Sequence, residues 1–243
     1  EEALSIERMR ADGIEVTRYL TRRLGADKII LMGGSWGSVL GIHMVKAEPG
    51  LFHAYIGTSQ LVSYRENQAD TYGRLLALAR TAGDHEVIGR LETIGPPPWS
   101  NPRSFGTVRR AVRKYEALST EPFPSGWWEP APPYATPERQ ADYEGGEEYS
   151  FIQYVGMNGD GMFSDVDLAA LGPEFPTPVF MVHGAEDLLT TPGTARRYFD
   201  SIRAPQKAFV LVPRAGHDPN QLVVDAQLDV LRRLVKPSIA RGG

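Results

Sequence analysis

One serine in this sequence lies in a setting that would make it a nucleophile. Ser35 is the centre of the run Gly33-Gly34-Ser35-Trp36-Gly37, which follows an apolar segment (28–32) and precedes a helix-like stretch (38–47). At the tip of a sharp strand-to-helix turn, a serine has a strained backbone, and glycines two positions away on either side let strand and helix approach closely. The turn also aims the first N–H groups of the helix at the group under attack. The pattern therefore predicts a nucleophile elbow.

A serine nucleophile needs a base and an acid, and candidates for both follow it in the chain. The β-rich run 178–182 leads into a loop that contains Asp187, and the run 207–212 leads into a loop that contains His217. Catalytic groups gather at the carboxyl ends of parallel strands, so we expect these loops to meet beside Ser35. His217 would take the hydroxyl proton as the serine attacks an acyl carbon. Asp187 would orient the imidazole and stabilise its charged form.

Other residues compete for these roles. Glu186 offers a second carboxylate beside Asp187, or both are solvated loop charges. Asp218 adjoins His217, but a sequence neighbour cannot easily face its own imidazole, which favours a loop or helix-start role. His183, at the end of a strand near the site, is the alternative base. The remaining histidines are interpreted as surface or packing residues: His43, His53 and His85.

Three short motifs together resemble a known enzyme family. The elbow Gly-Gly-Ser-Trp-Gly-Ser, the acid loop Val-His-Gly-x-x-Asp and the late Gly-His pair resemble the proline iminopeptidases and related serine hydrolases of the α/β-hydrolase superfamily. The resemblance spans most of the chain and implies an α/β fold of the α/β-hydrolase type, a mostly parallel sheet with flanking helices and a helical cap insertion. It also implies that Ser35, Asp187 and His217 are nucleophile, acid and base, and that the backbone N–H of Trp36 is one oxyanion donor.

The sequence departs from that family before the elbow. The His-Gly-Gly-Pro-Gly loop that supplies the family's second oxyanion donor does not occur here, and the chain begins in what is interpreted as the helix before the elbow strand. The N-terminal part of the usual sheet is thus expected either to have been removed from this chain or to lie on a companion segment or chain, which would cover the edge of the elbow strand. Without that partner, the chain is expected to be insoluble or to dimerise.

A second departure concerns substrate recognition. In proline iminopeptidases a cap glutamate, followed by Asn-His-Tyr-Phe, binds the free amine of the substrate. The corresponding stretch here is 151–154, with Ile152 near the place of the glutamate. This difference weakens the aminopeptidase interpretation and leaves the hydrolase interpretation unchanged.

Strand and helix patterns alternate along the chain, with one long interruption. Apolar positions recur at helical spacing from 6 to 24, between the expected N-cap Ser5 and the stop Gly25. The recurring positions are Ile6, Met9, Val16, Leu20 and Leu24. The remaining expected strand covers 54–58, and the remaining expected helices cover 65–81, 85–94, 107–118 and 221–235. A proline- and tryptophan-rich segment covers 121–137.

The interruption predicts the domain organisation. Between about 60 and 176 the strand signal disappears, and an insertion of this size above the catalytic edge is typical of a cap. We therefore predict a hydrolase core over 1–59 and 177–243, and a helical cap over 60–176.

The cap is expected to shape the substrate pocket. Its aromatic residues either line an apolar slot or pack short helices together: Trp99, Trp127, Trp128, Tyr134, Tyr149, Phe151 and Tyr154. Three glutamates beside Gly145-Gly146 either bind a substrate amine or belong to a solvated turn: Glu144, Glu147 and Glu148. The predicted substrate-binding residues are Trp127, Trp128, Tyr154 and Glu148.

Composition narrows the function further. The 243 residues are 42% hydrophobic and 23% charged, which suffices for one ordinary core. The net charge of −4 and the scattered basic residues argue against a nucleic-acid partner, and no apolar run approaches the roughly 18 residues of a membrane span. The absence of cysteine excludes disulfides and thiolate metal sites. No signal peptide pattern is visible, which favours a cytoplasmic location. Neither cofactor nor metal is expected, because the triad needs none.

Three functions are therefore considered. The first is a serine hydrolase that cleaves a small amide or peptide through an acyl-enzyme, as a proline iminopeptidase does when it releases an N-terminal residue. The second applies the same machinery to small esters. The third is a non-catalytic binding protein with an incomplete oxyanion hole, although an intact Ser-Asp-His set argues against it. The expected partner is a small molecule or a short peptide.

Overall fold

The chain folds around a four-stranded parallel sheet. The structure is a computed structural model that describes residues 4–241. The strands are β1 (Ile29–Gly34), β2 (Phe52–Thr58), β3 (Val179–Gly184) and β4 (Lys207–Val212), and they lie in the order β1-β2-β3-β4. Every neighbouring pair is parallel, so the carboxyl ends of all four strands lie at one edge. This arrangement is the expected α/β fold.

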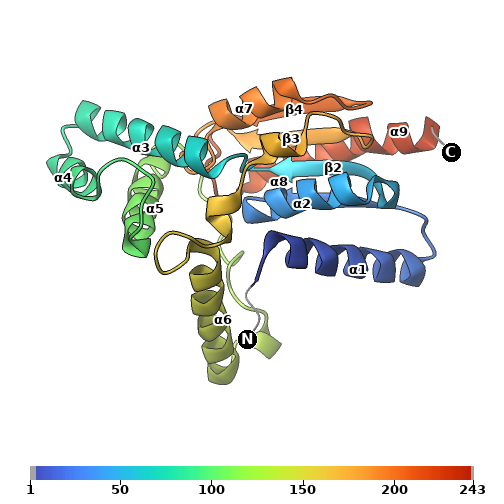
Figure 1. Ribbon diagram of the computed structural model, residues 1–243, viewed down its shortest axis with the longest axis horizontal. Helices are drawn as coiled ribbons and strands as arrows, with labels where there is room; N and C mark the ends of the chain where they lie inside the picture. Colours follow the sequence, from blue (N-terminus) through green and yellow to red (C-terminus); the bar gives the residue numbers. More distant parts are fainter. Residues whose placement is uncertain (1–3, 242–243) are drawn as a thin grey trace.

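One face of the sheet is covered by helices that flank the elbow and the acid loop. These are α2 (Trp36–Ala47) and α7 (Pro192–Ser201), and α1 (Ile6–Leu24) packs outside α2, as Figure 1 shows. Their apolar side chains form the larger core with the sheet, including Ile42 and Phe199.

The other face is covered by the C-terminal helices. These are α8 (Gln221–Val230), a π-helical turn (Leu231–Val235) and α9 (Lys236–Arg241), which pack on Ile56 and Phe180. The expected helix over 221–235 is therefore one α-helix that continues through the π turn. With helices on both faces, β3 is buried throughout and β2 is buried except at the half-buried His53, as is usual for the centre of a parallel sheet.

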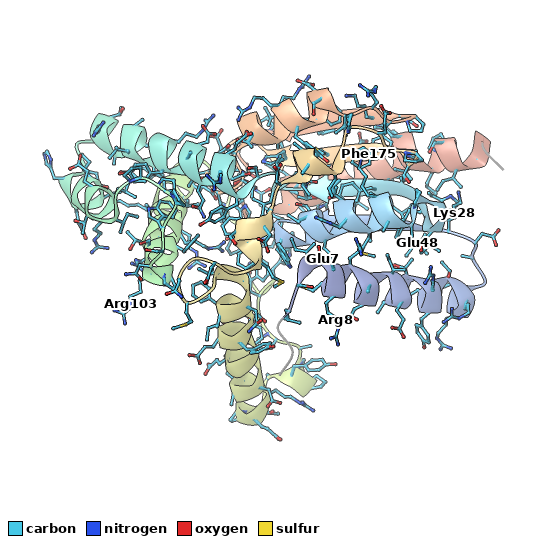
Figure 2. The ribbon with its side chains drawn as sticks, in the orientation of Figure 1. Glu7, Arg8, Lys28, Glu48, Arg103 and Phe175 are labelled. Atoms are coloured by element: carbon cyan, nitrogen blue, oxygen red, sulfur yellow. The ribbon has the colours of Figure 1, made fainter. Side chains whose placement is uncertain are left out.

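The first helix has the predicted bounds but a different buried face. Ser5 accepts a hydrogen bond from the Arg8 N–H and Gly25 ends the helix with φ 62°, so both capping predictions are confirmed. The buried positions are Ile6, Ile14, Thr17 and Thr21. Val16, Leu20 and Leu24 of the predicted apolar set are exposed, because α1 rests on α2 near Gly13 and Met44. Figure 2 shows Arg8 on the side of α1 away from α2.

The segment between β2 and β3 is helical, as predicted. It contains α3 (Tyr64–Thr81), α4 (His85–Ile94), α5 (Pro102–Glu116) and α6 (Pro137–Val155). The first three share a small core of their own that includes Leu75, Leu91 and Val112. Short 3-10 turns also occur in the chain: Pro49–Leu51, Pro132–Tyr134, Met162–Asp165 and Leu168–Leu171. None of the helices within residues 4–241 is long and apolar enough to cross a membrane.

Two cap helices differ from the sequence expectation. Helix α5 begins five positions before the predicted start at 107, because Asn101 caps it and Pro102 occupies its first turn. Helix α6 was not predicted, and the Gly145-Gly146 pair lies inside it without breaking it. The interpretation of the neighbouring glutamates as a solvated turn is therefore wrong.

The elbow strand lies at the edge of the sheet that the structure describes. β1 pairs with β2 on one side, and the strand order places no other described strand beside it. Met32 of this strand is 43% exposed, although an elbow strand was expected to be flanked on both sides.

Candidate active site

The turn between β1 and α2 has the strained geometry of a nucleophile elbow. Ser35 has φ 50° and ψ −120°, a region that non-glycine residues rarely occupy. A Cβ placed on Gly33 would lie 2.3 Å from the carbonyl oxygen of Gly37, so glycine is required at position 33 for the close approach of strand and helix. A Cβ on Gly37 would meet no described atom within 4 Å, so this contact does not explain the second glycine.

Three loops bring the predicted triad residues together. His217 Nε2 lies 3.0 Å from Ser35 Oγ, and His217 Nδ1 lies 3.2 Å from Asp187 Oδ2. Asp187 follows β3 and His217 follows β4, so each occupies a loop at the carboxyl edge of the sheet. Asp187 is 1% exposed and His217 is 8% exposed, which keeps the acid–base pair away from bulk water. This chain of contacts can carry a proton from the serine hydroxyl to the imidazole.

Asp187 is held as a carboxylate by its own loop. Its Oδ1 accepts hydrogen bonds from the N–H groups of Leu189 (2.9 Å) and Thr190 (2.8 Å), and its Oδ2 accepts one from the Thr190 hydroxyl (2.7 Å). Burial by itself would raise the pKa of Asp187, but the charge and hydrogen bond of His217 and the bond from Thr190 together hold that pKa well below its usual range. The fixed negative charge can stabilise an imidazolium.

Burial and the neighbouring charge also oppose each other in setting the pKa of the His217 imidazole, each in the direction opposite to its effect on Asp187. Burial would lower the pKa of His217, but the charge and hydrogen bond of Asp187 raise it above its ordinary value, and Glu116 adds to that effect. Ser59 holds the backbone of the histidine, because its hydroxyl donates to the His217 carbonyl at 3.1 Å. The imidazole is thus held in place, and its affinity for a proton is increased.

The competing residues occupy other positions. His183 is fully buried, and its Nε2 lies 2.5 Å from the Thr190 carbonyl and 3.5 Å from Asp187 Oδ2. Burial lowers the pKa of His183, so the ring is a neutral neighbour of Asp187, and no contact with Ser35 is among those described. Asp218 is exposed at the surface, and Glu186 is only partly buried. Neither contributes a side-chain hydrogen bond to His217 among the described contacts.

An oxyanion donor is available beside the serine. Trp36 and Gly37 open α2, and the first N–H groups of a helix have no acceptor within it. The indole of Trp36 packs edge-on against Tyr154 of α6 at 5.0 Å between centroids, which ties the start of α2 to the cap. Tyr154 in turn stacks on Phe163 at 4.8 Å.

A cavity of about 610 Å³ opens at Ser35 beneath the cap. Most of its wall is apolar, and the charged residues that line it are Arg109, Arg113 and Glu147. Of the predicted aromatics, Trp99, Phe151 and Tyr154 line the cavity.

The other predicted substrate-binding residues are not among those that line the cavity. Trp127 is 39% exposed and Trp128 is 65% exposed, because both lie in an irregular turn between α5 and α6. Glu148 lies on α6 one position after Glu147, and a step of one residue on a helix turns the side chain by about 100°. Glu147 is therefore the glutamate of this group that lines the cavity.

Sequence reasoning missed one buried carboxylate near the triad. Glu116 ends α5, is 9% exposed, and accepts hydrogen bonds from the N–H groups of Leu188 (2.8 Å) and His217 (3.0 Å). The sequence places it about 70 residues before the acid loop, and no motif surrounds it. A faint signal is that Glu116 is the one acidic residue in a helix that carries five basic residues.

The fold and the site together define a class. An elbow serine, an aspartate and a histidine, in that chain order, on loops at the carboxyl edge of a parallel sheet form the arrangement of α/β hydrolases. The sequence signature of the α/β hydrolase fold family matches residues 8–220, and the chain belongs to that family.

Individual relatives are distant. The chain is 21% identical over 221 residues to the probable aminopeptidase YbaC of Bacillus subtilis (strain 168), which covers 90% of this chain and 68% of that protein. The crystal structure of VinJ superposes with a TM-score of 0.58 at 18% identity, covering 90% of this chain and 70% of VinJ. An esterase from Exiguobacterium antarcticum gives a TM-score of 0.52 at 13% identity, covering 96% of this chain and 74% of that chain. These likenesses in structure support the fold.

Proposed function

We propose that this protein is a serine hydrolase that cleaves a small amide or peptide through an acyl-enzyme, with N-terminal residue release as its main reaction. The observation that carries the proposal is the position of His217 between Ser35 and Asp187, at 3.0 and 3.2 Å. The name of the Bacillus subtilis relative, a probable aminopeptidase, supports the amide substrate.

The proposed reaction has two halves. In the first, Ser35 Oγ bonds to the carbonyl carbon while its proton moves to His217 Nε2, and the carbonyl oxygen becomes an oxyanion beside the Trp36 N–H. The C–N bond then breaks as His217 returns the proton to the departing amine. In the second half, water attacks the acyl-enzyme with His217 again as base, and the acid is released.

The contents of the cavity bear on the choice of substrate. Glu147 is the acidic residue of the lining that could bind a substrate amine, in place of the predicted Glu148. The mostly apolar wall favours, as a second candidate, small esters with apolar acyl groups, because a triad that is acylated by amides is also acylated by esters.

Two experiments on the complete protein test the proposal. A fluorophosphonate probe is expected to label Ser35, and the absence of labelling in folded protein would favour a non-catalytic binding role. Turnover of proline naphthylamide, its N-blocked form and a p-nitrophenyl ester would then separate the candidates. If blocking the amine leaves the amide rate unchanged, release of an N-terminal residue is excluded.

A further inference from the structure

Glu116 joins two catalytic loops that come from different strands. Its Oε1 accepts from the N–H of Leu188, which directly follows the acid, and its Oε2 accepts from the N–H of His217 itself. The residue belongs to α5 of the cap, whereas both N–H groups belong to loops of the core. One carboxylate therefore spans the acid loop, the histidine loop and the cap.

The packing around this carboxylate leaves little freedom. A Cβ on Gly216 would lie 2.3 Å from Glu116 Oε2, so the histidine loop can approach the carboxylate only with glycine at that position. Both N–H groups would otherwise lie near the triad without an acceptor, and a buried unpaired N–H destabilises the loop that carries it. The charged groups that act on Glu116 are Asp187, from the acid loop, and His217, while Arg109 acts on His217 from the same helix.

We propose that Glu116 is a positioning residue, which sets the distance between Asp187 and His217 by holding both of their loops and which supports the charged form of the imidazole. Burial and the nearby Asp187 raise the pKa of Glu116 to about 7. At pH 8 it is therefore mostly a carboxylate, and its charge favours a proton on His217. The proposal rests on the proposed hydrolase function.

The test compares Glu116→Gln, Glu116→Ala and the control Glu121→Gln. The rate at which a fluorophosphonate labels Ser35 is measured from pH 5 to 9, because labelling needs the base but no particular substrate. In Glu116→Gln, Ser35 is expected to be labelled roughly ten- to hundredfold more slowly at pH 8, because the two loops are less well positioned. The fall of the labelling rate at acid pH is expected to move to lower pH, because the imidazolium loses a stabilising negative charge. Glu116→Ala is expected to be slower still.

The control variant Glu121→Gln distinguishes the positioning role of Glu116 from a general effect of removing a carboxylate near the histidine loop. Glu121 pairs with Arg214 at 2.5 Å on that loop but is not bonded to either catalytic loop N–H. Glu121→Gln is expected to label at the wild-type rate. If Glu116→Gln, shown to be folded by circular dichroism, keeps the wild-type rate and acid limb, the positioning role is refuted. If wild-type protein is not labelled, it is the proposed function that fails.

A separate observation concerns two arginines in the cavity wall. Arg109 and Arg113 lie one turn apart on α5 and both line the cavity that opens at Ser35. No described residue forms an ion pair or hydrogen bond with either guanidinium, although most other arginines of the cap are paired. Arg109 is near enough to the triad that its charge lowers the pKa of His217, acting against Asp187.

The geometry points to a substrate that carries a carboxylate, bound by Arg109 and Arg113, beside an apolar portion that fills the rest of the cavity. The lining holds two cations and one acidic residue, Glu147, in a wall that is otherwise mostly apolar. Arginine suits this task because its planar group can donate two parallel hydrogen bonds to a carboxylate. This inference, too, rests on the proposed function.

Protection of Ser35 from the probe provides the test. Hexanoate and hexanamide have the same shape apart from the charged end, and each is titrated against the labelling rate at pH 8. Hexanoate is expected to protect at a concentration about tenfold lower or more, in keeping with charge-assisted hydrogen bonds. The double variant Arg109→Gln/Arg113→Gln is expected to lose this preference.

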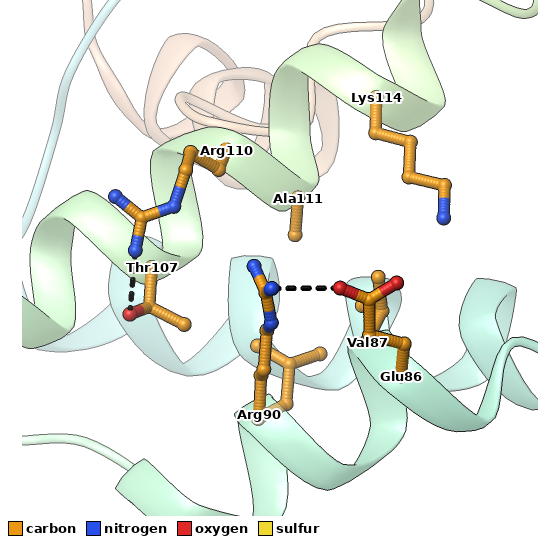
Figure 3. Close-up of a pocket in the computed structure, with 8 residues that line it drawn as sticks. Glu86, Val87, Arg90, Thr107, Arg110, Ala111 and Lys114 are labelled. Carbon is orange, nitrogen blue, oxygen red and sulfur yellow. Dashed lines mark hydrogen bonds and ion pairs between the residues drawn. The ribbon is translucent and has the colours of Figure 1, made fainter.

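The matched control is Arg110→Gln on the same helix. Arg110 bonds to the Thr107 hydroxyl in a separate pocket of about 180 Å³ between α4 and α5, as Figure 3 shows. This variant is expected to keep the preference for hexanoate. Equal protection by the two compounds in wild-type protein would overturn the inference. It would also be overturned if the double variant kept the preference for hexanoate, since that preference would then arise at His217.

Discussion

The two sides of Ser35 differ in how many of the groups that the proposed reaction needs are supplied by the described residues. Toward β3 and β4, the hydroxyl meets His217, the imidazole meets Asp187, and both loops are held by Glu116. Toward β1, which is the edge strand of the described sheet, a pocket of about 320 Å³ borders the elbow, lined by the end of β1 and by the histidine loop. The comparison separates two parts of catalysis. The groups proposed to move a proton are assembled within this chain, whereas the proposed oxyanion hole has one donor here, the Trp36 N–H, and is proposed to take its second from a companion segment.

The largest expected effect lies on the completed side. Ser35→Ala and His217→Ala should each lower kcat on the order of a millionfold, because the nucleophile and base act as one unit, and Asp187→Asn should lower it a few tens of thousandfold. Steady-state kinetics on the best substrate would measure this ranking. Glu186→Gln serves as the control, because Glu186 adjoins the acid but has no side-chain bond to the histidine, and it should retain wild-type activity. An equal loss in Glu186→Gln would show that the acid has been wrongly assigned.

The next effect concerns the open side. A companion segment that covers β1 and adds an oxyanion donor should raise kcat about a hundredfold to a thousandfold over residues 1–243 alone. Residues 1–243 alone should associate or precipitate, because β1 exposes unpaired backbone groups at the sheet edge. Analytical ultracentrifugation checks the second statement. A stable, monodisperse monomer would contradict the need for a companion.

A smaller effect should appear as pH dependence. The pKa of His217 is raised and the imidazole must be neutral to act as base, so kcat/KM should fall at low pH with a midpoint above 6.5.

The stability of the protein should have a separate pH dependence. The pKa of Glu116 is raised to about 7 in the folded protein, so its protonation contributes to the free energy of unfolding. This contribution is fully present below the pKa of about 4.5 in the unfolded chain and is lost as the pH rises to about 7.

Thermal unfolding would detect that second dependence. Between pH 5 and pH 8, wild-type protein should lose on the order of 5 °C in Tm relative to Glu116→Gln, whose side chain does not titrate. Asp187 affects the pH dependence of stability in the opposite direction, because its lowered pKa adds stability that is lost only in strong acid. The two proteins are therefore compared above pH 5. Parallel Tm curves for the two proteins would show that Glu116 does not titrate in this range.

These features differ in how far the sequence predicts them. The elbow was predictable because one short segment holds the strand, the strained serine and the required Gly33. Asp187 and His217 were predictable in position because each follows a recognisable strand, and parallel strands deliver their loops to one edge. Glu116 was not, since its role depends on where α5 ends relative to loops far along the chain.

The cap shows the same limit at the level of whole elements. Helix α6 was missed because two adjacent glycines and a high density of charge obscure its pattern, yet Thr136 caps it and Pro137 begins it. Composition alone selected Trp127 and Trp128, but an aromatic type does not fix the direction of a side chain. Figure 1 shows α6 extending away from the sheet, and the α6 residues that line the cavity at Ser35 lie in its second half, from Glu147 to Val155.

The smallest expected effect tests that distinction within the cap. Trp127→Ala and Trp128→Ala should change kcat/KM by no more than about twofold, because both side chains are exposed and neither lines the cavity. The ring contact of Trp128 is with Phe123, which is itself exposed and outside the cavity lining. Tyr154→Ala is the matched comparison, since Tyr154 lines the cavity and packs against Trp36 at the start of α2. It should lower kcat/KM at least tenfold by loosening the oxyanion donor. If either tryptophan variant were impaired as strongly as Tyr154→Ala, the turn that carries Trp127 and Trp128 would have to close over the cavity when substrate binds.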